Sequence, residues 1–256
     1  MVCPEKSLYC SQKIKSLQLK ARTTNDQMNN IKLNSLLTAT AIVVICEAGG
    51  GSILRIMATL STIETVLVLR TVEIPLMAVV MILSKSDCPN PCSFNHLKKG
   101  VITGLVWSFY FAVAALIGGV VILFTTKTNP FLLFNSPIVS NLNHKKTFDL
   151  AIFLITGCII SPVAEELFFR GFVYSFVRKY GVMYAITIST LIFVLPHISG
   201  GNAIIAPNLF IPLTGGFVFA LSYEYSKSLA APVIIHILGN SSIFTLHLIF
   251  TNHFFH

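Results

Sequence analysis

The chain has 256 residues, of which 54% are apolar and 11% charged, and its formal net charge is +8. Soluble domains usually carry about 25% charged residues, so the composition argues against a water-soluble fold. It is typical of an integral membrane protein with several spans.

Several classes of protein are excluded by the motifs that the chain lacks. It has neither a G-x-x-x-x-G-K-[ST] phosphate loop nor a G-x-G-x-x-G turn, so we expect no nucleotide. The basic residues lie mainly between apolar segments and are typical of membrane topology signals, so nucleic acid is not an expected partner. The expected partners are the lipid bilayer and a peptide or protein substrate.

Hydropathy predicts an all-α integral membrane protein in three parts. Residues 1–32 are a basic cytosolic tail, residues 33–147 hold the first membrane helices, and residues 148–256 hold the helices that carry polar motifs. Apolar segments are expected at 33–57, 61–83, 101–124, 148–164, 182–198, 203–223 and 230–251. Each is a long apolar run without strict alternation, which predicts a bundle of about seven to eight transmembrane helices around an intramembrane polar site.

The distribution of Lys and Arg predicts the orientation of this multi-pass protein. Thirteen of them fall on the tail and on the segments 84–99, 165–179 and 224–229, whereas Lys127, Lys145 and Lys146 fall on the opposite side. Positive residues favour the cytosolic side, so the amino terminus and the segment 165–179 are expected there. A prokaryotic protein of this kind would occupy the cell membrane, and a eukaryotic one the endoplasmic reticulum.

Ionisable side chains at membrane depth are costly, and they therefore indicate either an internal partner or a function. Glu166 and Arg170 have the i, i+4 spacing of an ion pair, which predicts a structural role for both. Glu165 points about 100° away and lacks that partner, so its carboxylate stays available for chemistry. The alternative is a boundary network in which both glutamates pair with Arg170 and Lys179. For Glu64, Arg70 and Glu73, pairing within the bundle is the simplest interpretation.

Two further clusters contain histidine. His236 and Asn240 are four residues apart and share one helix face, where two donors suit a developing oxyanion. A hydrogen bond between helices is the alternative for this pair, and a satisfied interhelical histidine is the alternative for His197. Taken together, the clusters supply the groups for attack of water on a carbonyl. Glu165 and His197 would remove the proton, and His236 and Asn240 would hold the oxyanion.

Three motifs resemble, in the same order, those of the CPBP family of CAAX-protease and bacteriocin-processing intramembrane endopeptidases. They are Glu-Glu-x-x-x-Arg at 165–170, Phe-x-x-x-His at 193–197 and His-x-x-x-Asn at 236–240. The resemblance covers about residues 149–250. It implies that Glu165 and His197 activate water, that His236 and Asn240 form the oxyanion hole, and that Glu166 and Arg170 support the site. It also implies a glutamate-dependent endopeptidase acting near the cytosolic surface, which could remove the carboxyl-terminal tripeptide of a prenylated CAAX protein.

Three alternatives to this function stay open. Zinc could bind Glu165, His197 and His236, but no pair of these residues has the close spacing of a metal helix and no H-E-x-x-H motif occurs, so no cofactor is expected. A proton-coupled transporter could use the same Glu/His cluster, although transporters often show two related halves and the cluster lies wholly in the second half. A non-catalytic immunity or scaffold protein could retain the fold without turnover.

Overall fold

The computed structural model describes residues 4–44, 62–83, 94–126, 151–152, 154–198 and 206–254. Within these ranges the chain is helical and contains no strand, as the hydropathy pattern predicts. Residues 45–61 and 127–150 lie outside the described ranges. They include the second half of the expected first span and the three lysines assigned to the opposite side.

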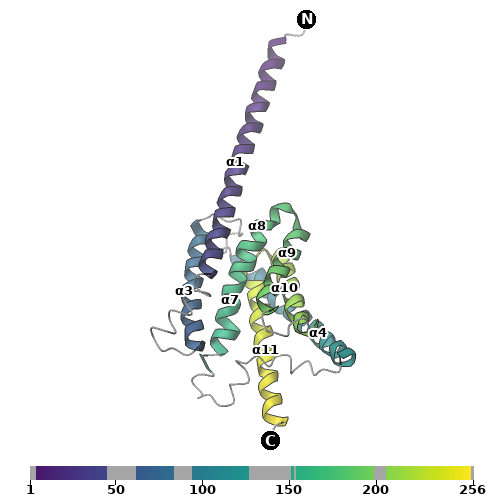
Figure 1. Cartoon of the computed structure of the whole chain (residues 1–256). Coiled ribbons are helices and arrows are strands. Elements are labelled where there is room, and N and C mark those ends of the chain that lie inside the picture. The colour runs from purple at the N-terminus through teal and green to yellow at the C-terminus, as the bar shows by residue number, and fades with distance from the viewer. Residues whose placement is uncertain are drawn as a thin grey trace.

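Within the described ranges, six helices of 13 or more residues build the bundle, and Figure 1 shows their arrangement. They are α1 (Pro4–Val44), α3 (Thr62–Leu83), α4 (Phe94–Thr126), α9 (Val182–Val194), α10 (Ala206–Ser226) and α11 (Ala230–Phe254). The motif-bearing segment lies between α4 and α9 in sequence and is divided into short pieces. These are the π-helix η4 (Thr156–Ile160), α7 (Ser161–Glu166), the π-helix η5 (Leu167–Tyr174), α8 (Ser175–Val177) and the 3₁₀-helix η6 (Arg178–Tyr180).

Helix α1 is continuous across residues 32 and 33, where the sequence predicts a boundary between tail and first span. Its amino-terminal part projects well beyond the other helices (Figure 1). Its carboxy-terminal part packs on the bundle, where Ala39 lies in a buried cluster with Met77 of α3 and Phe172 of η5. Helix α1 and α3 together cover one side of the motif-bearing segment.

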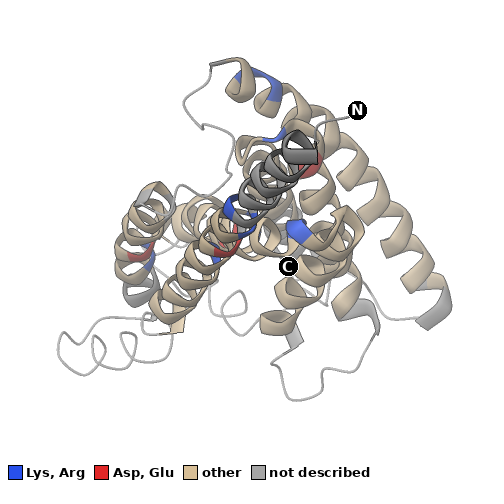
Figure 2. Ribbon diagram, turned by 90° about the horizontal axis from the view of Figure 1, so that it is seen from above, with Lys and Arg blue, Asp and Glu red and all other residues tan. Residues whose placement is uncertain are grey.

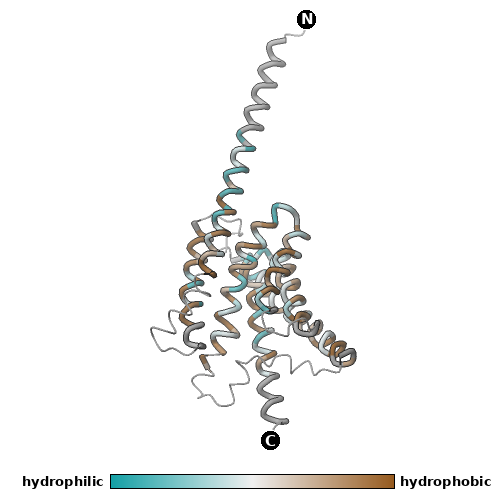
Figure 3. Tube along the Cα trace, viewed as in Figure 1, coloured by the Kyte–Doolittle hydropathy of each residue, from teal (hydrophilic) through white to brown (hydrophobic). Residues whose placement is uncertain are grey.

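Helix α4 carries the clearest membrane-spanning stretch. Its residues Asn95–Ile122 are long and apolar enough to cross a bilayer, and shorter apolar helices occupy Val182–His197 and Ala230–Thr245 (Figure 3). Large apolar side chains such as Phe109 and Leu116 are 67% and 65% exposed, as expected of a surface that faces lipid rather than water. An all-helical membrane fold agrees with these features, while the number of spans stays a prediction.

The motif-bearing segment is the centre of the molecule. It also packs against α9 and α10, and α11 contacts η4 and α7. The side chains of Phe111, Phe169, Phe193 and Phe219 form a buried aromatic cluster together with Ile235 of α11. Helices α4 and α11 approach closely because Gly104 has no side chain. A Cβ atom there would lie 2.9 Å from the Cβ of Ile234.

Three of the four basic segments assigned to one side of the membrane meet at one end of the bundle, where Lys and Arg are visible from above in Figure 2. Lys99 donates to the carbonyl of Tyr225 (2.8 Å), and Arg178 and Lys227 both pair with Glu224. The structure thus brings these three segments together at one end of the bundle. That this end faces the cytosol stays a prediction.

Candidate active site

The two neighbouring glutamates end α7, which lies between two π-helices. π-Helices are rare and are frequent at functional sites. In η4 the N–H of Ser161 donates to the carbonyl of Thr156, and Pro162, which has no N–H, follows at the start of α7. Glu165 keeps 24% of its side chain exposed, whereas the side chain of Glu166 is fully buried. One carboxylate is therefore accessible and its neighbour is enclosed.

The enclosed carboxylate is paired with a buried arginine, as the i, i+4 spacing predicts. Nη1 of Arg170 donates to Oε1 of Glu166 (3.0 Å) and lies 3.0 Å from Oε2, and its Nη2 donates to the carbonyl of Gly216 in α10 (2.9 Å). The guanidinium carbon lies 4.9 Å from the ring centroid of Phe193 and 5.3 Å from that of Phe219. Ion pairing and cation–π contacts together offset the cost of burying both charges.

His236 of α11 lies between the two glutamates. Its Nδ1 is 2.9 Å from Oε1 of Glu166, and its Nε2 is 3.9 Å from Oε2 of Glu165. The ring stacks on Phe219, with centroids 4.8 Å apart and planes 23° apart, and meets the edge of Phe193. These contacts fix the orientation of the imidazole from three sides.

The contact with Glu166 determines which nitrogen of His236 is free to act. An ionised carboxylate only accepts hydrogen bonds, so Nδ1 carries the hydrogen that it donates to Glu166. Nε2, which faces Glu165, is then an acceptor in the neutral ring and a donor only when the ring holds a second proton. The 3.9 Å gap between Nε2 and the Glu165 carboxylate is too long for a direct hydrogen bond.

Asn240 lies one turn after His236 on α11 and binds the backbone of the motif-bearing segment. Its Nδ2 donates to the carbonyl of Gly157 in η4 (3.1 Å). The amide carries two hydrogens, and Gly157 takes one of them. The structure thus places Asn240 beside the π-helix that precedes the glutamates, and α11 contributes both residues of the third motif to this region.

His197 is placed differently from the other site residues. Helix α9 ends at Val194, and His197 lies in the following 3₁₀-helix η7 (Leu195–Ile198), next to Pro196, where it is exposed. Its Nδ1 is 2.9 Å from the carbonyl of Phe193, and the two rings are 5.0 Å apart. Among the contacts of the described residues, none joins His197 to Glu165. Phe193 touches both His197 and His236 and so separates the two histidines.

Two residues of this region carry no signal in the sequence. Phe219 stacks on the imidazole and Gly216 accepts from Arg170, yet both lie in the stretch 215–221 of α10, which contains no polar side chain. A Cβ on Gly216 would meet Thr190 at 3.0 Å, so a larger residue would push α10 away from α9. Aromatic and glycine residues in apolar helices are typical of packing, and nothing in their spacing distinguishes these two.

The structure does not gather the residues considered for zinc. Over the part of the chain that is described, no group of three or more His, Cys, Asp or Glu side chains is arranged to hold a metal ion. His197, one of the three ligands considered, contacts Phe193 and neither of the other two. The donor set of a three-ligand zinc site is therefore not assembled here.

A second polar network holds the far end of the motif-bearing segment, outside the apolar runs. Glu224 of α10 accepts hydrogen bonds from the Tyr174 hydroxyl (2.6 Å), from Nε and Nη2 of Arg178 (3.0 and 2.9 Å), and pairs with Lys227 at 2.5 Å. Partial burial acts to raise the pKa of Glu224, but the bonds from Arg178, Lys227 and Tyr174 outweigh it and lower the pKa to about 2. This network anchors α10 to the segment that carries both site glutamates.

Comparison with known proteins agrees with the resemblance of the motifs. Residues 147–242 match the family model described as type II CAAX prenyl endopeptidase Rce1-like, and all six site residues lie within this range. The chain is also 32% identical over 109 residues to the membrane-embedded CAAX protease MroQ of Staphylococcus aureus (strain USA300). That similarity covers 39% of this chain and 41% of the relative. No solved structure matches the chain at comparable significance.

The family-model match runs from before η4 into α11, the part of the chain where the glutamates, His236 and Asn240 meet. The chain spans about two fifths of the length of the relative that it matches. The motifs, their order and the matched family model agree. Residues 147–242 of this chain are therefore similar to the Rce1-like CAAX prenyl endopeptidases.

Proposed function

We propose that this protein is an intramembrane, glutamate-dependent endopeptidase that hydrolyses a peptide bond near the cytosolic membrane surface. The observation that carries the proposal is that two adjacent carboxylates have different surroundings. Glu166 is buried against Arg170 and His236, while Glu165 stays partly accessible with Nε2 of His236 at 3.9 Å. An accessible carboxylate can act as a general base, and a buried one can hold a hydrogen-bond donor in the orientation that an oxyanion requires.

In the proposed reaction Glu165 takes a proton from a water molecule as the oxygen of that water adds to the carbonyl carbon. The C–O bond forms, the carbonyl π-electrons move to oxygen, and the resulting oxyanion needs hydrogen-bond donors. Nε2 of His236 is such a donor when the ring holds both protons, because Nδ1 is kept on Glu166. The second N–H of Asn240, which is not bonded to Gly157, is the other donor to the oxyanion. Collapse of the oxyanion breaks the C–N bond, and the leaving nitrogen takes the proton back from Glu165.

His197 is proposed as the second group that orders the water. Because its Nδ1 contacts the carbonyl of Phe193, its Nε2 points to no partner among the described residues. Catalytic hydrogen bonds are often long in the absence of substrate and shorten in the complex. A movement of η7 towards Glu165 on substrate binding would complete the pair that the motifs predict.

The proposed substrate is a peptide with a prenylated carboxyl terminus, from which a tripeptide would be removed. An apolar chain on the substrate would suit a site enclosed by Phe193, Phe219 and the other rings of the aromatic cluster. The proposed setting is a bundle of seven to eight membrane helices with a cytosolic amino terminus. A site without a bound cofactor is sufficient for this chemistry.

The test is cleavage of a farnesylated CAAX peptide by the purified full-length protein, with and without a metal chelator. Glu165→Gln should lower turnover by at least about 100-fold, because it removes the base while keeping the shape of the side chain. Asp26→Asn is the matched control, since it makes the same change on an exposed surface of α1. It should leave turnover unchanged.

Unchanged cleavage by Glu165→Gln, with the variant folded as judged by its melting temperature, would exclude the proposed mechanism. Loss of cleavage on adding chelator would support the zinc alternative. If the wild-type protein cleaves neither this peptide nor an unprenylated one, yet moves protons across a vesicle membrane, the transporter alternative would replace the endopeptidase.

A further inference from the structure

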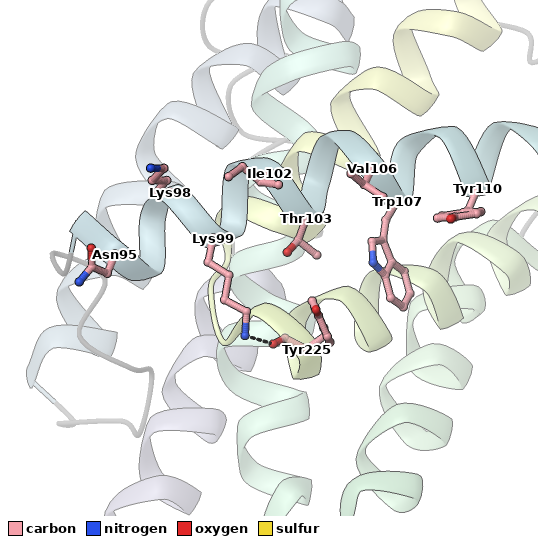
Figure 4. A pocket seen from close by; sticks show the side chains of 9 residues that line it. All are labelled: Asn95, Lys98, Lys99, Ile102, Thr103, Val106, Trp107, Tyr110 and Tyr225. Carbon is pink, nitrogen blue, oxygen red and sulfur yellow. Dashed lines mark hydrogen bonds between the residues drawn. The ribbon is translucent and has the colours of Figure 1, made fainter.

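A second candidate site lies at the end of α4, apart from the glutamate–histidine cluster. It is a pocket of about 560 Å³, formed by one face of α4 from Asn95 to Tyr110 and by Tyr225 of α10 (Figure 4). None of the six site residues lines it. The pocket is at the same end of the bundle as Arg178 and Lys227, which pair with Glu224, the residue before Tyr225.

The polar end of the pocket carries unbalanced positive charge. Lys99 donates to the backbone carbonyl of Tyr225 (2.8 Å), and its Nζ lies 4.7 Å over the Tyr225 ring. Lys98 is exposed and also lines the pocket (Figure 4). Among the described residues no carboxylate lies within ion-pairing distance of either ammonium group, since Glu224 is occupied by Arg178 and Lys227. Two cations without an internal counter-ion suit an anion.

The other wall of the pocket is apolar and aromatic. Ile102, Val106 and Tyr110 lie along it, and Trp107 packs near Tyr225 with ring centroids 6.3 Å apart. This wall continues into the exposed apolar surface of the same helix, which is long and apolar enough to cross a membrane. Aromatic rings at the end of a span, next to lysines, are typical of the level at which lipid headgroups lie.

We propose that this pocket binds an anionic phospholipid of the leaflet that meets this end of the bundle. The phosphate would lie at Lys98 and Lys99, Trp107 and the two tyrosines would lie at headgroup level, and an acyl chain would follow Ile102 and Val106 along α4. A lipid fits better than a peptide because the apolar wall is continuous with the surface that already faces lipid. The bound lipid would hold α4 against α10, and the site is independent of the proposed proteolysis.

The test uses native mass spectrometry of the purified full-length protein in detergent. It is titrated separately with phosphatidylglycerol, with phosphatidylcholine of the same acyl chains, and with glycerol phosphate. We expect phosphatidylglycerol to bind more tightly than either of the others. Lys98→Gln should weaken this binding about fivefold, and Lys98→Gln with Lys99→Gln should weaken it by roughly the square of that factor.

Lys98→Gln is the decisive single variant, because Lys99 also bonds the backbone of α10 and its loss could disturb folding. The matched control is Lys20→Gln with Arg22→Gln, which removes two exposed charges from α1 outside the pocket. Equal binding of the two phospholipids, or equal weakening by the control, would overturn the proposal. Displacement of phosphatidylglycerol by a farnesylated peptide would also overturn it, because the pocket would then be a substrate site. Binding of glycerol phosphate as tight as that of phosphatidylglycerol would overturn it as well.

Discussion

Two glutamate–arginine pairs hold the motif-bearing segment, and their surroundings differ. The inner pair, Glu166 and Arg170, has no exposed side-chain surface, whereas in the outer pair the side chains of Glu224 and Arg178 are 20% and 41% exposed. A buried pair loses its hydration and depends on each partner, because removing one leaves an uncompensated charge. An exposed pair keeps water as an alternative partner and contributes little.

The two pairs also differ in what else depends on them. Glu166 accepts from His236, so the inner pair connects the stability of the bundle to the orientation of a site residue. Glu224 is shared by Tyr174, Arg178 and Lys227, and the loss of one donor leaves two. The comparison indicates that the same pair of residue types serves the site at one end and fastens helices at the other.

The largest effect should come from breaking the inner pair. Arg170→Ala leaves the Glu166 carboxylate buried without its counter-ion and should lower the free energy of unfolding by about 3–5 kcal/mol. The measurement is thermal or denaturant unfolding of the purified protein, alongside the peptide assay. Arg170→Ala combined with Glu166→Gln should be more stable than Arg170→Ala alone. A normal melting temperature in Arg170→Ala would contradict this account of the inner pair.

An intermediate effect is expected at Asn240, which fastens α11 to η4. Asn240→Ala removes the bond to Gly157 and should cost about 1 kcal/mol of stability. If its second N–H also holds the oxyanion, turnover of the folded protein should fall by about 100-fold or more. Ser242→Ala is the control, because its hydroxyl bonds only within the same helix, to Leu238. Equal turnover in both variants would leave Asn240 with a positioning role alone.

The smallest effect should come from the outer pair. Glu224→Gln removes the charged acceptor that Tyr174, Arg178 and Lys227 share. It should lower the free energy of unfolding at neutral pH by less than Arg170→Ala does, because Arg178 and Lys227 keep access to water. Unfolding of Glu224→Gln beside Arg170→Ala measures the difference directly. If Glu224→Gln were as damaging as Arg170→Ala, exposure would not be what distinguishes the two pairs.

Lowering the pH should test the role of Glu224 in the outer pair. The folded-state pKa of Glu224, about 2, lies below the ordinary value of about 4.3. The ionised form is thus favoured by folding, and its contribution is complete above about pH 4.3 and is lost as the pH falls towards 2. The stability difference between wild type and Glu224→Gln should therefore shrink over that interval. A difference that grows on acidification would contradict the direction of this shift.

The sequence predicts local geometry well and long-range contacts poorly. The spacing of Glu166 and Arg170 predicts their ion pair, and the turn of about 100° per residue predicts that Glu165 faces elsewhere. The contact between Glu166 and His236 joins residues 70 positions apart and depends on how α11 packs, which no local spacing encodes. The family resemblance identifies Glu166 and His236 as site residues, but it does not predict that they contact each other.

Other features follow from backbone details that a hydropathy pattern does not resolve. Residues 154–177 read as an ordinary apolar run followed by a motif, yet they contain two π-helices. Pro196 indicates a bend near His197, and the structure has a 3₁₀-helix there that leaves the histidine exposed. The spacing of Gly100 and Gly104 permits a close approach of two helices, and the identity of the partner, α11, comes only from the fold.

The π-helix η5 separates the inner pair from the outer one, and its wider turns set the angle between them. Glu166 precedes η5 and Arg178 follows α8, so the number of residues from 167 to 174 determines which way Arg178 faces. Deleting one residue there would rotate everything beyond it by roughly a quarter of a turn relative to α7. Arg178 would then turn away from Glu224 while Glu166 still held Arg170. The length of this segment is consequently as constrained as the identity of its charged residues.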